Sequence, residues 1–235
     1  MNNGCARMET GHGKPARMGV MEGQVMAKKA QYDQATIDEA LKPQTPRLKT
    51  MYDEVICPKI ASEFGIKNAM AMPKLEKITI NVNVGRYLDG TKIPANVRDA
   101  AVHTLTTISG QKPQIIMAKK SVSNFKVREG YETAHKVTLR RDRMWHFLDR
   151  LMNLTTPRIK DFRGVSDKSF DRQGSYSMGL TEQGVFPEIN MAEQNFTHGM
   201  NINISLSNSN PAMSRFVLAE LGMPFKKPVK SKKKS

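Results

Sequence analysis

Three segments of the sequence alternate apolar and polar residues, and this alternation limits what the chain can fold into more than any other feature. Residues 78–84 read ITINVNV, residues 136–140 read KVTLR and residues 200–206 read MNINISL. Successive side chains of a strand point to opposite faces, so each segment predicts a strand with one apolar and one polar face. Such strands favour an open sheet with one solvated face over a parallel sheet that helices cover on both faces.

Helical patterns and turn signals occupy the intervening segments. In the first helix Pro58 is expected to cause a kink and Gly65 to end it, and Asp142 is expected to cap a later one. A short strand is predicted at 114–118 and a long loop at 162–179. The predicted helices span residues 48–64, 95–108, 142–156 and 212–221. The predicted class is α+β: a largely antiparallel sheet with helices packed on one face and the other face open.

The positive charge of the chain is concentrated in two places. Its 235 residues carry 37 Lys and Arg against 22 Asp and Glu, a formal net charge of +15. Residues 112–163 hold thirteen Lys and Arg against five acids, and residues 226–235 hold six Lys and no acid. A bare lysine run is typical of a solvated tail. The internal excess is interleaved with aromatic residues such as Phe125 and Trp145, a mixture typical of RNA contacts, so a polyanionic partner is expected.

The residue types that carry catalysis or bind metals do not form any recognisable motif. The two cysteines exclude both a disulfide framework and a cysteine-rich zinc site. None of the five histidines has a metal-binding spacing, and no nucleotide-binding glycine motif is present. No apolar run approaches the ~20 residues that a membrane helix needs. We therefore expect a binding protein with no catalytic residues, no cofactor, no metal and no membrane contact.

Two surfaces are candidates for RNA binding. The first is the polar face of the predicted sheet, where short amides and hydroxyls could approach ribose hydroxyls and phosphates closely. Its residues are Lys77, Thr79, Asn81, Asn83, Lys136, Thr138, Arg140, Asn201, Asn203 and Ser205. The second is the basic stretch 112–128, in which Ser, Asn and Phe stand among the lysines. Both surfaces have an alternative interpretation, as an ordinary solvated face and a solvated charge run.

Several strings of residues, in one order along the chain, are similar to a known family. They are SGQKP at 109–113, AKKSV at 118–122, KVTLR at 136–140, RMW at 143–145, DFRG at 161–164, KSF at 168–170 and YSMG at 176–179. From about residue 47 to residue 227 the chain resembles bacterial-type ribosomal protein L5, the 5S rRNA-binding family of the large ribosomal subunit.

This resemblance implies three sets of contact residues. The sheet face would bind 5S rRNA through Lys77, Asn81, Gln111, Thr138 and Arg140. The basic loop would reach the elbow of the P-site tRNA through Lys119, Lys120, Ser121, Asn124 and Phe125. The long loop would touch small-subunit protein S13 and form an intersubunit bridge through Arg163, Ser166, Lys168, Phe170, Tyr176 and Met178.

The resemblance also implies a structural, non-enzymatic role in the central protuberance of the large subunit. Large-subunit rRNA and neighbouring 5S-binding ribosomal proteins would be further partners, in a cytoplasmic rather than an organellar ribosome. The expected domains are a disordered extension at 1–46, a 5S rRNA-binding domain at 47–225 and a lysine-rich tail at 226–235. The residues leave open a different function, that of a free-standing RNA-binding regulator or RNA chaperone on the same scaffold. They also leave open whether translation starts at Met1 or at Met26.

Overall fold

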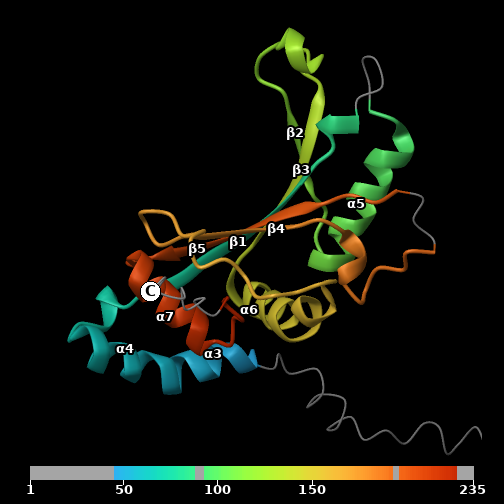
Figure 1. The fold of residues 1–235 in the computed structure, drawn as a ribbon. Helices are drawn as coiled ribbons and strands as arrows, with labels where there is room; N and C mark the ends of the chain where they lie inside the picture. Colours follow the sequence, from blue (N-terminus) through green and yellow to red (C-terminus); the bar gives the residue numbers. More distant parts are fainter. Residues whose placement is uncertain (1–44, 88–92, 193–195, 227–235) are drawn as a thin grey trace, which may run out of the picture. The chain divides into compact units, whose positions relative to one another are not determined.

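A five-stranded antiparallel sheet organises the part of the chain that the structure describes (Figure 1). The structure is a computed structural model and describes residues 45–87, 93–192 and 196–226. The strands are β1 (Lys74–Asn83), β2 (Gln114–Met117), β3 (Glu132–Leu139), β4 (Tyr176–Leu180) and β5 (Met200–Ser207). They lie in the order β2-β3-β1-β5-β4, and each neighbouring pair is antiparallel. The predicted α+β class is therefore confirmed.

Strand β4 lies where the sequence predicts the end of a long loop. Its Tyr176 pairs with Ile204 of β5, so the loop prediction over 162–179 is wrong for its last four residues. Ser177 and Gly179 have low strand propensity, and Gly179 adds no side chain to the sheet. The segment is short and its strand conformation depends on β5, which a local pattern does not reveal.

The first helical run continues through Pro58, with a change of winding just before it. The run consists of α3 (Arg47–Met51), a π-helical turn (Tyr52–Ile56) and α4 (Cys57–Phe64). Proline lacks an N–H and its ring crowds the carbonyl of the preceding turn. The wider π-helical turn just before Pro58 accommodates this ring. Gly65, with φ 66°, ends α4 in the left-handed conformation, as predicted.

The other helices agree with the sequence in position but not in every detail. They are α5 (Ala95–Ser109), α6 (Arg141–Arg150, prolonged by the π-helical turn Leu151–Thr155) and α7 (Pro211–Glu220). Arg140, and not Asp142, occupies the cap position of α6, so the predicted cap is wrong. Asp142 lies in the first turn, where a carboxylate suits the helix dipole, and its Oδ1 is 3.4 Å from Nζ of Lys49 in α3.

One face of the sheet forms the hydrophobic core together with the helices. Ile78, Ile80 and Val82 of β1 are fully buried. In Figure 1, α6 and α7 lie on one side of the strands, and Leu148 of α6 and Val217 of α7 belong to the same core. Trp145 of α6 also points inward, and the centroid of its ring is 5.6 Å from the ring centroid of Tyr52. Burial of these side chains leaves the opposite face of the sheet to the polar residues.

Nearly all of the predicted disordered extension and nearly all of the lysine-rich tail lie outside the described residues. Within residues 45–87, 93–192 and 196–226, no helix is long and apolar enough to cross a membrane. The same residues contain no group of three or more His, Cys, Asp or Glu that could hold a metal ion.

Candidate nucleic-acid interface

The strand register aligns the polar residues of the sheet into rows that cross it from edge to edge. We call this surface the polar face. Asn81 of β1 lies opposite Lys136 of β3 on one side and opposite Asn201 of β5 on the other. This first row consists of Gln114, Lys136, Asn81, Asn201 and Gly179. The second row consists of Thr138, Thr79, Asn203 and Ser177. Five strands that are distant in sequence thus contribute to one continuous polar surface.

Burial separates the two faces of the sheet sharply. Ile78, Ile80 and Val82 are fully buried, whereas Thr79 and Asn81 between them are half-buried and Asn83 is exposed. Most residues of the two rows are short amides or hydroxyls. Such groups can both donate and accept hydrogen bonds while letting a ligand approach the backbone closely. The face therefore offers many uncharged polar contacts in place of a few strong ionic ones.

The structure brings four of the five residues predicted to bind 5S rRNA to this face or to its edge. Lys77, Asn81 and Thr138 belong to the rows or to the pair next to them, in which Lys77 lies opposite Ser205. Arg140 directly follows β3, and its guanidinium is 3.6 Å from the carboxylate of Glu76. Gln111 is half-buried in the turn between α5 and β2, and strand register does not align it with the rows.

The sequence prediction missed the contribution of the two edge strands. Gln114 of β2 and Ser177 of β4 extend the rows to the edges of the sheet. The sequence predicts a loop around Ser177, which conceals the place of this residue on the face. A serine-glycine alternation around Met178 is the only local signal of this strand, and it is weak.

The basic loop between β2 and β3 is a small hairpin whose side chains reach into solvent. Val122 and Val127 exchange backbone hydrogen bonds of 2.8 and 3.2 Å, and Lys126 has a φ of 53° at the turn. Figure 1 shows this hairpin at the end of β2 and β3 that is remote from α6 and α7. Phe125 at its tip is 75% exposed, so its ring is available to a partner.

The other predicted residues of this loop are exposed as well. They are Lys119, Lys120, Ser121 and Asn124. Oγ of Ser121 accepts a hydrogen bond of 3.0 Å from the backbone N–H of Glu129, which ties the two arms of the loop together. A hollow of about 630 Å³ lies between the loop tip and β1, and both Asn83 and Phe125 line it. The loop and the polar face therefore share a border.

The residues predicted for the intersubunit bridge divide into a buried base and an exposed rim. Tyr176 is fully buried, and its hydroxyl donates a hydrogen bond of 2.8 Å to the carbonyl of Ser166. The ring centroids of Phe170 and Tyr176 are 4.7 Å apart. Arg163 and Lys168 are exposed, while Met178 is half-buried. Burial raises the pKa of Tyr176 to about 12, so its hydroxyl remains a donor at neutral pH.

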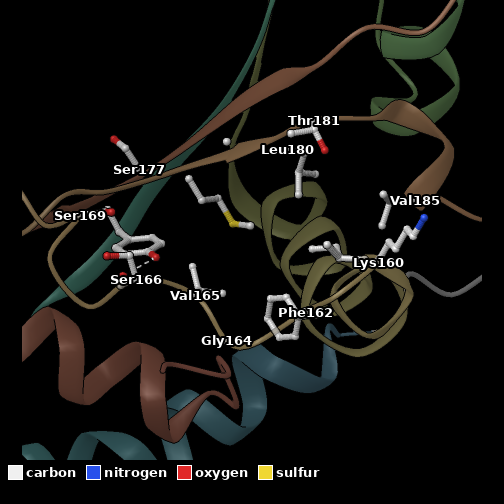
Figure 2. A pocket seen from close by; sticks show the side chains of 14 residues that line it. Lys160, Phe162, Gly164, Val165, Ser166, Ser169, Ser177, Leu180, Thr181 and Val185 are labelled. Atoms are coloured by element: carbon white, nitrogen blue, oxygen red, sulfur yellow. Dashed lines mark hydrogen bonds between the residues drawn. The ribbon is translucent and has the colours of Figure 1, made fainter. Parts of the chain in front are cut away.

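The last described residues of the chain hold this loop in place. The backbone N–H of Val165 donates to the carbonyl of Pro224 over 2.8 Å, and that of Lys226 donates to the carbonyl of Val165 over 2.9 Å. A hollow of about 420 Å³ lies between this loop and β4. Figure 2 shows its wall, with Ser166, Ser169 and Ser177 on one side and Lys160 and Val185 on the other.

Two buried histidines lie beneath the sheet, and the sequence does not single them out. His135 of β3 is fully buried, and neither of its ring nitrogens has a hydrogen-bond partner among the described residues. The ring of His198 has Nε2 3.4 Å from Oγ1 of Thr104 in α5. Burial lowers the pKa of both imidazoles, so both are neutral at physiological pH. We assign them to the core and not to the interface.

Comparisons with known proteins identify the family of the chain. The family model described as "Ribosomal protein L5" matches residues 68–128, and a second model, which describes the C-terminus of the same ribosomal family, matches residues 132–225. The chain is 46% identical over 179 residues to "Large ribosomal subunit protein uL5" of Acholeplasma laidlawii, covering 76% of this chain and 97% of the relative.

Relatives from distant bacteria give the same result. Identity to the protein of that name from Streptomyces coelicolor is 47% over 182 residues, with 77% of this chain and 96% of the relative covered. Identity to that of Bdellovibrio bacteriovorus is 47% over 181 residues, with 77% and 99% covered. The chain with this open polar sheet and its two projecting loops therefore belongs to the uL5 family of ribosomal proteins, which are structural and not enzymatic.

Proposed function

We propose that the protein is a structural component of the large ribosomal subunit and binds 5S rRNA through the polar face of its sheet. The observation that carries this proposal is the pair of polar rows, which cross the uncovered side of the sheet. Double-stranded RNA presents ribose hydroxyls and phosphates along a wide, shallow groove. A sheet surface of amides and hydroxyls, with Lys136 and Lys77 among them, matches that chemistry.

The basic loop is proposed to contact the elbow of the P-site tRNA. Its exposed Lys119 and Lys120 can reach phosphates, and Phe125 can pack against a base or a ribose. Phosphate contacts carry little sequence information, which suits a partner that changes with every elongation cycle. The loop extends from the sheet, so it can hold one RNA while the polar face holds another.

The loop from Arg163 to Met178 is proposed to contact small-subunit protein S13 and to form an intersubunit bridge. Exposed Arg163 and Lys168 are available to a partner, whereas Phe170 and Tyr176 form the base beneath them. We therefore assign the two aromatic residues a positioning role. Large-subunit rRNA and neighbouring 5S-binding proteins are the expected further partners.

Binding of purified full-length protein to 5S rRNA tests the polar face directly. Asn203→Glu places a negative charge in the second row, and Asn96→Glu makes the same change on the exposed surface of α5. We expect the first variant to lose about tenfold or more in affinity, because it brings a carboxylate against RNA phosphates, and the second to lose little. Equal losses in both variants, with the fold intact, would contradict the proposal.

Sedimentation separates a ribosomal component from a free regulator. The proposal predicts that the protein fractionates stoichiometrically with large subunits in a sucrose gradient, and that it stays there in high salt. A protein found mainly at the top of the gradient would favour a free-standing RNA-binding protein or RNA chaperone.

A further inference from the structure

A third and smaller hollow opens at the end of β1 where three asparagines meet. Its volume is about 220 Å³. We call it the asparagine pocket, and its wall consists of Asn81, Asn83, Tyr87, Leu180, Gly199, Met200 and Asn201. We propose that this pocket takes a single unpaired adenine base of the bound RNA, an inference that rests on the proposed binding of RNA to the polar face.

The strand register explains why there is space for a ligand here. Asn201 lies opposite Asn81 on one side and opposite Gly179 on the other. Because Gly179 has no side chain, the first row ends at the side chain of Asn201, which lines the pocket. A Cβ atom at Gly179 would stand 3.4 Å from Oδ1 of Asn201, so a larger side chain at this position would crowd that amide.

The amides of the pocket are incompletely satisfied within the protein. Oδ1 of Asn83 accepts a hydrogen bond of 2.9 Å from the backbone N–H of Gly85, which leaves its amide nitrogen as the group available to a ligand. Oδ1 of Asn81 is shielded from solvent and has no donor among the described residues. Buried acceptors without partners are rare, and they are a feature of sites that a ligand completes.

An aromatic wall beside the amides suits a flat heterocycle. The ring centroids of Tyr87 and Phe196 are 4.4 Å apart, and the angle between the two ring planes is 89°. This edge-to-face contact restrains the Tyr87 ring, so the ring can present a fixed surface to a base. Aromatic side chains that pack against unstacked bases are a general means of holding single-stranded RNA.

The composition of the pocket selects the ligand. None of its seven described lining residues is charged, so a phosphate would lack a cation there. Guanine is read mostly by Arg or Lys and cytosine by Asp or Glu, whereas the amide of Asn pairs with N6 and N7 of adenine.

The volume of the pocket is below the ~300 Å³ of a pocket for a drug-sized ligand and well above the ~30 Å³ share of one water. A single base is the ligand of matching size, and Lys136, opposite Asn81, can meet its phosphate.

Interference mapping with 5S rRNA tests this proposal on the full chain. RNA transcribed with a low fraction of 7-deazaadenosine phosphorothioate lacks N7 at random adenosines, and the molecules that bind are separated and cleaved. We expect one unpaired adenosine to interfere with binding of the wild-type protein. In Asn201→Ala, whose affinity should be roughly tenfold lower, the same adenosine should no longer interfere.

Three further variants keep the result specific. Asn203→Ala, in the neighbouring row, should lower affinity and leave the interference in place. Tyr87→Ala should weaken binding about tenfold, while Tyr87→Phe retains the ring and should bind like the wild type. Circular dichroism of each variant checks the fold.

The outcomes separate the pocket from the polar face. Wild-type binding to 5S rRNA with no adenosine whose interference disappears in Asn201→Ala would overturn the pocket and leave the proposed function standing. Interference by 7-deazaguanosine that disappears in Asn201→Ala would overturn the choice of adenine. Failure of the wild-type protein to bind 5S rRNA would overturn the proposed function, and the pocket with it.

Discussion

The hydroxyl of Tyr176 donates a hydrogen bond of 2.8 Å to the carbonyl of Ser166, and this bond closes the base of the loop that carries the proposed bridge residues. Ser166 and Tyr176 both stand among the residues predicted to bridge the subunits, yet Tyr176 is fully buried. Its contact is therefore with the protein itself, and any effect on the proposed partner would come through the shape of the loop.

Replacement of this tyrosine measures that support. We expect Tyr176→Phe to lower the free energy of unfolding by about 1 to 2 kcal/mol, because the carbonyl of Ser166 loses its donor in a partly buried site. Urea unfolding of the purified protein checks the value. As a control, Tyr131→Phe changes a half-buried tyrosine outside this loop and should cost less. Equal stability of Tyr176→Phe and the wild type would mean that the hydrogen bond contributes nothing.

Removal of one hydroxyl from the polar face should weaken RNA binding without changing charge. Thr138→Ala deletes a side chain in the second row, and we expect the affinity for 5S rRNA to fall by about 1 to 3 kcal/mol if the contact is well made. Filter binding at fixed salt measures it. Thr107→Ala on the exposed surface of α5 is the matched control and should bind normally. Unchanged affinity in Thr138→Ala would remove this position from the interface.

The basic loop should affect tRNA and not 5S rRNA. Replacing both Lys119 and Lys120 by Ala should leave the 5S rRNA complex assembled and reduce retention of P-site tRNA on ribosomes. The deficit should be largest at low salt and shrink as salt rises, because salt screens the phosphate contacts that these lysines make in the wild type. Replacing exposed Lys67 and Lys160 removes the same charge elsewhere and serves as the control. Loss of 5S rRNA binding with normal tRNA retention would reverse the assignment of the two surfaces.

The buried histidines predict how stability depends on pH. Burial lowers the pKa of His135 and His198 in the folded protein, so the unfolded chain binds more protons once the pH falls below the ordinary histidine value of 6.5. The free energy of unfolding should therefore be fully retained above about pH 7 and should decrease as the pH falls towards about 5. Urea titrations across this range measure the slope.

A substitution identifies the groups responsible for that slope. His135→Leu removes one buried imidazole and should flatten the pH dependence, whereas His146→Gln changes an exposed histidine of α6 and should leave it unchanged. A slope that responds only to the exposed histidine would contradict the role of the buried pair.

The sequence is sufficient to predict which residues share a face, because alternation is a local property of each strand. Thr79, Asn81 and Asn83 occupy the polar side of β1 as predicted, and Ile78, Ile80 and Val82 the buried side. Local patterns do not determine which strands become neighbours. The pairing of Asn81 with both Lys136 and Asn201 depends on strand order and register, which tertiary packing sets.

The same distinction explains what the sequence does not reveal. Ser177 and Gly179 become part of a strand only through β5, and the burial of His135 beside α5 depends on how that helix packs against β3. The proposed bridge loop shows the limit most clearly, because a motif identifies Tyr176 but cannot tell a buried support from an exposed contact. Packing, and not residue type, decides between these roles.

The backbone pairing of Val165 with Pro224 and Lys226 has a consequence for biogenesis. A chain still under synthesis cannot order its bridge loop until the segment around residue 225 has been made, since the partner carbonyl and N–H groups do not yet exist. Strand β1, at the centre of the sheet, likewise cannot complete its hydrogen-bonded pairing until β5 has been synthesised. The proposed intersubunit contact would therefore be acquired late, so that only a chain synthesised through this segment could present the loop to the small subunit.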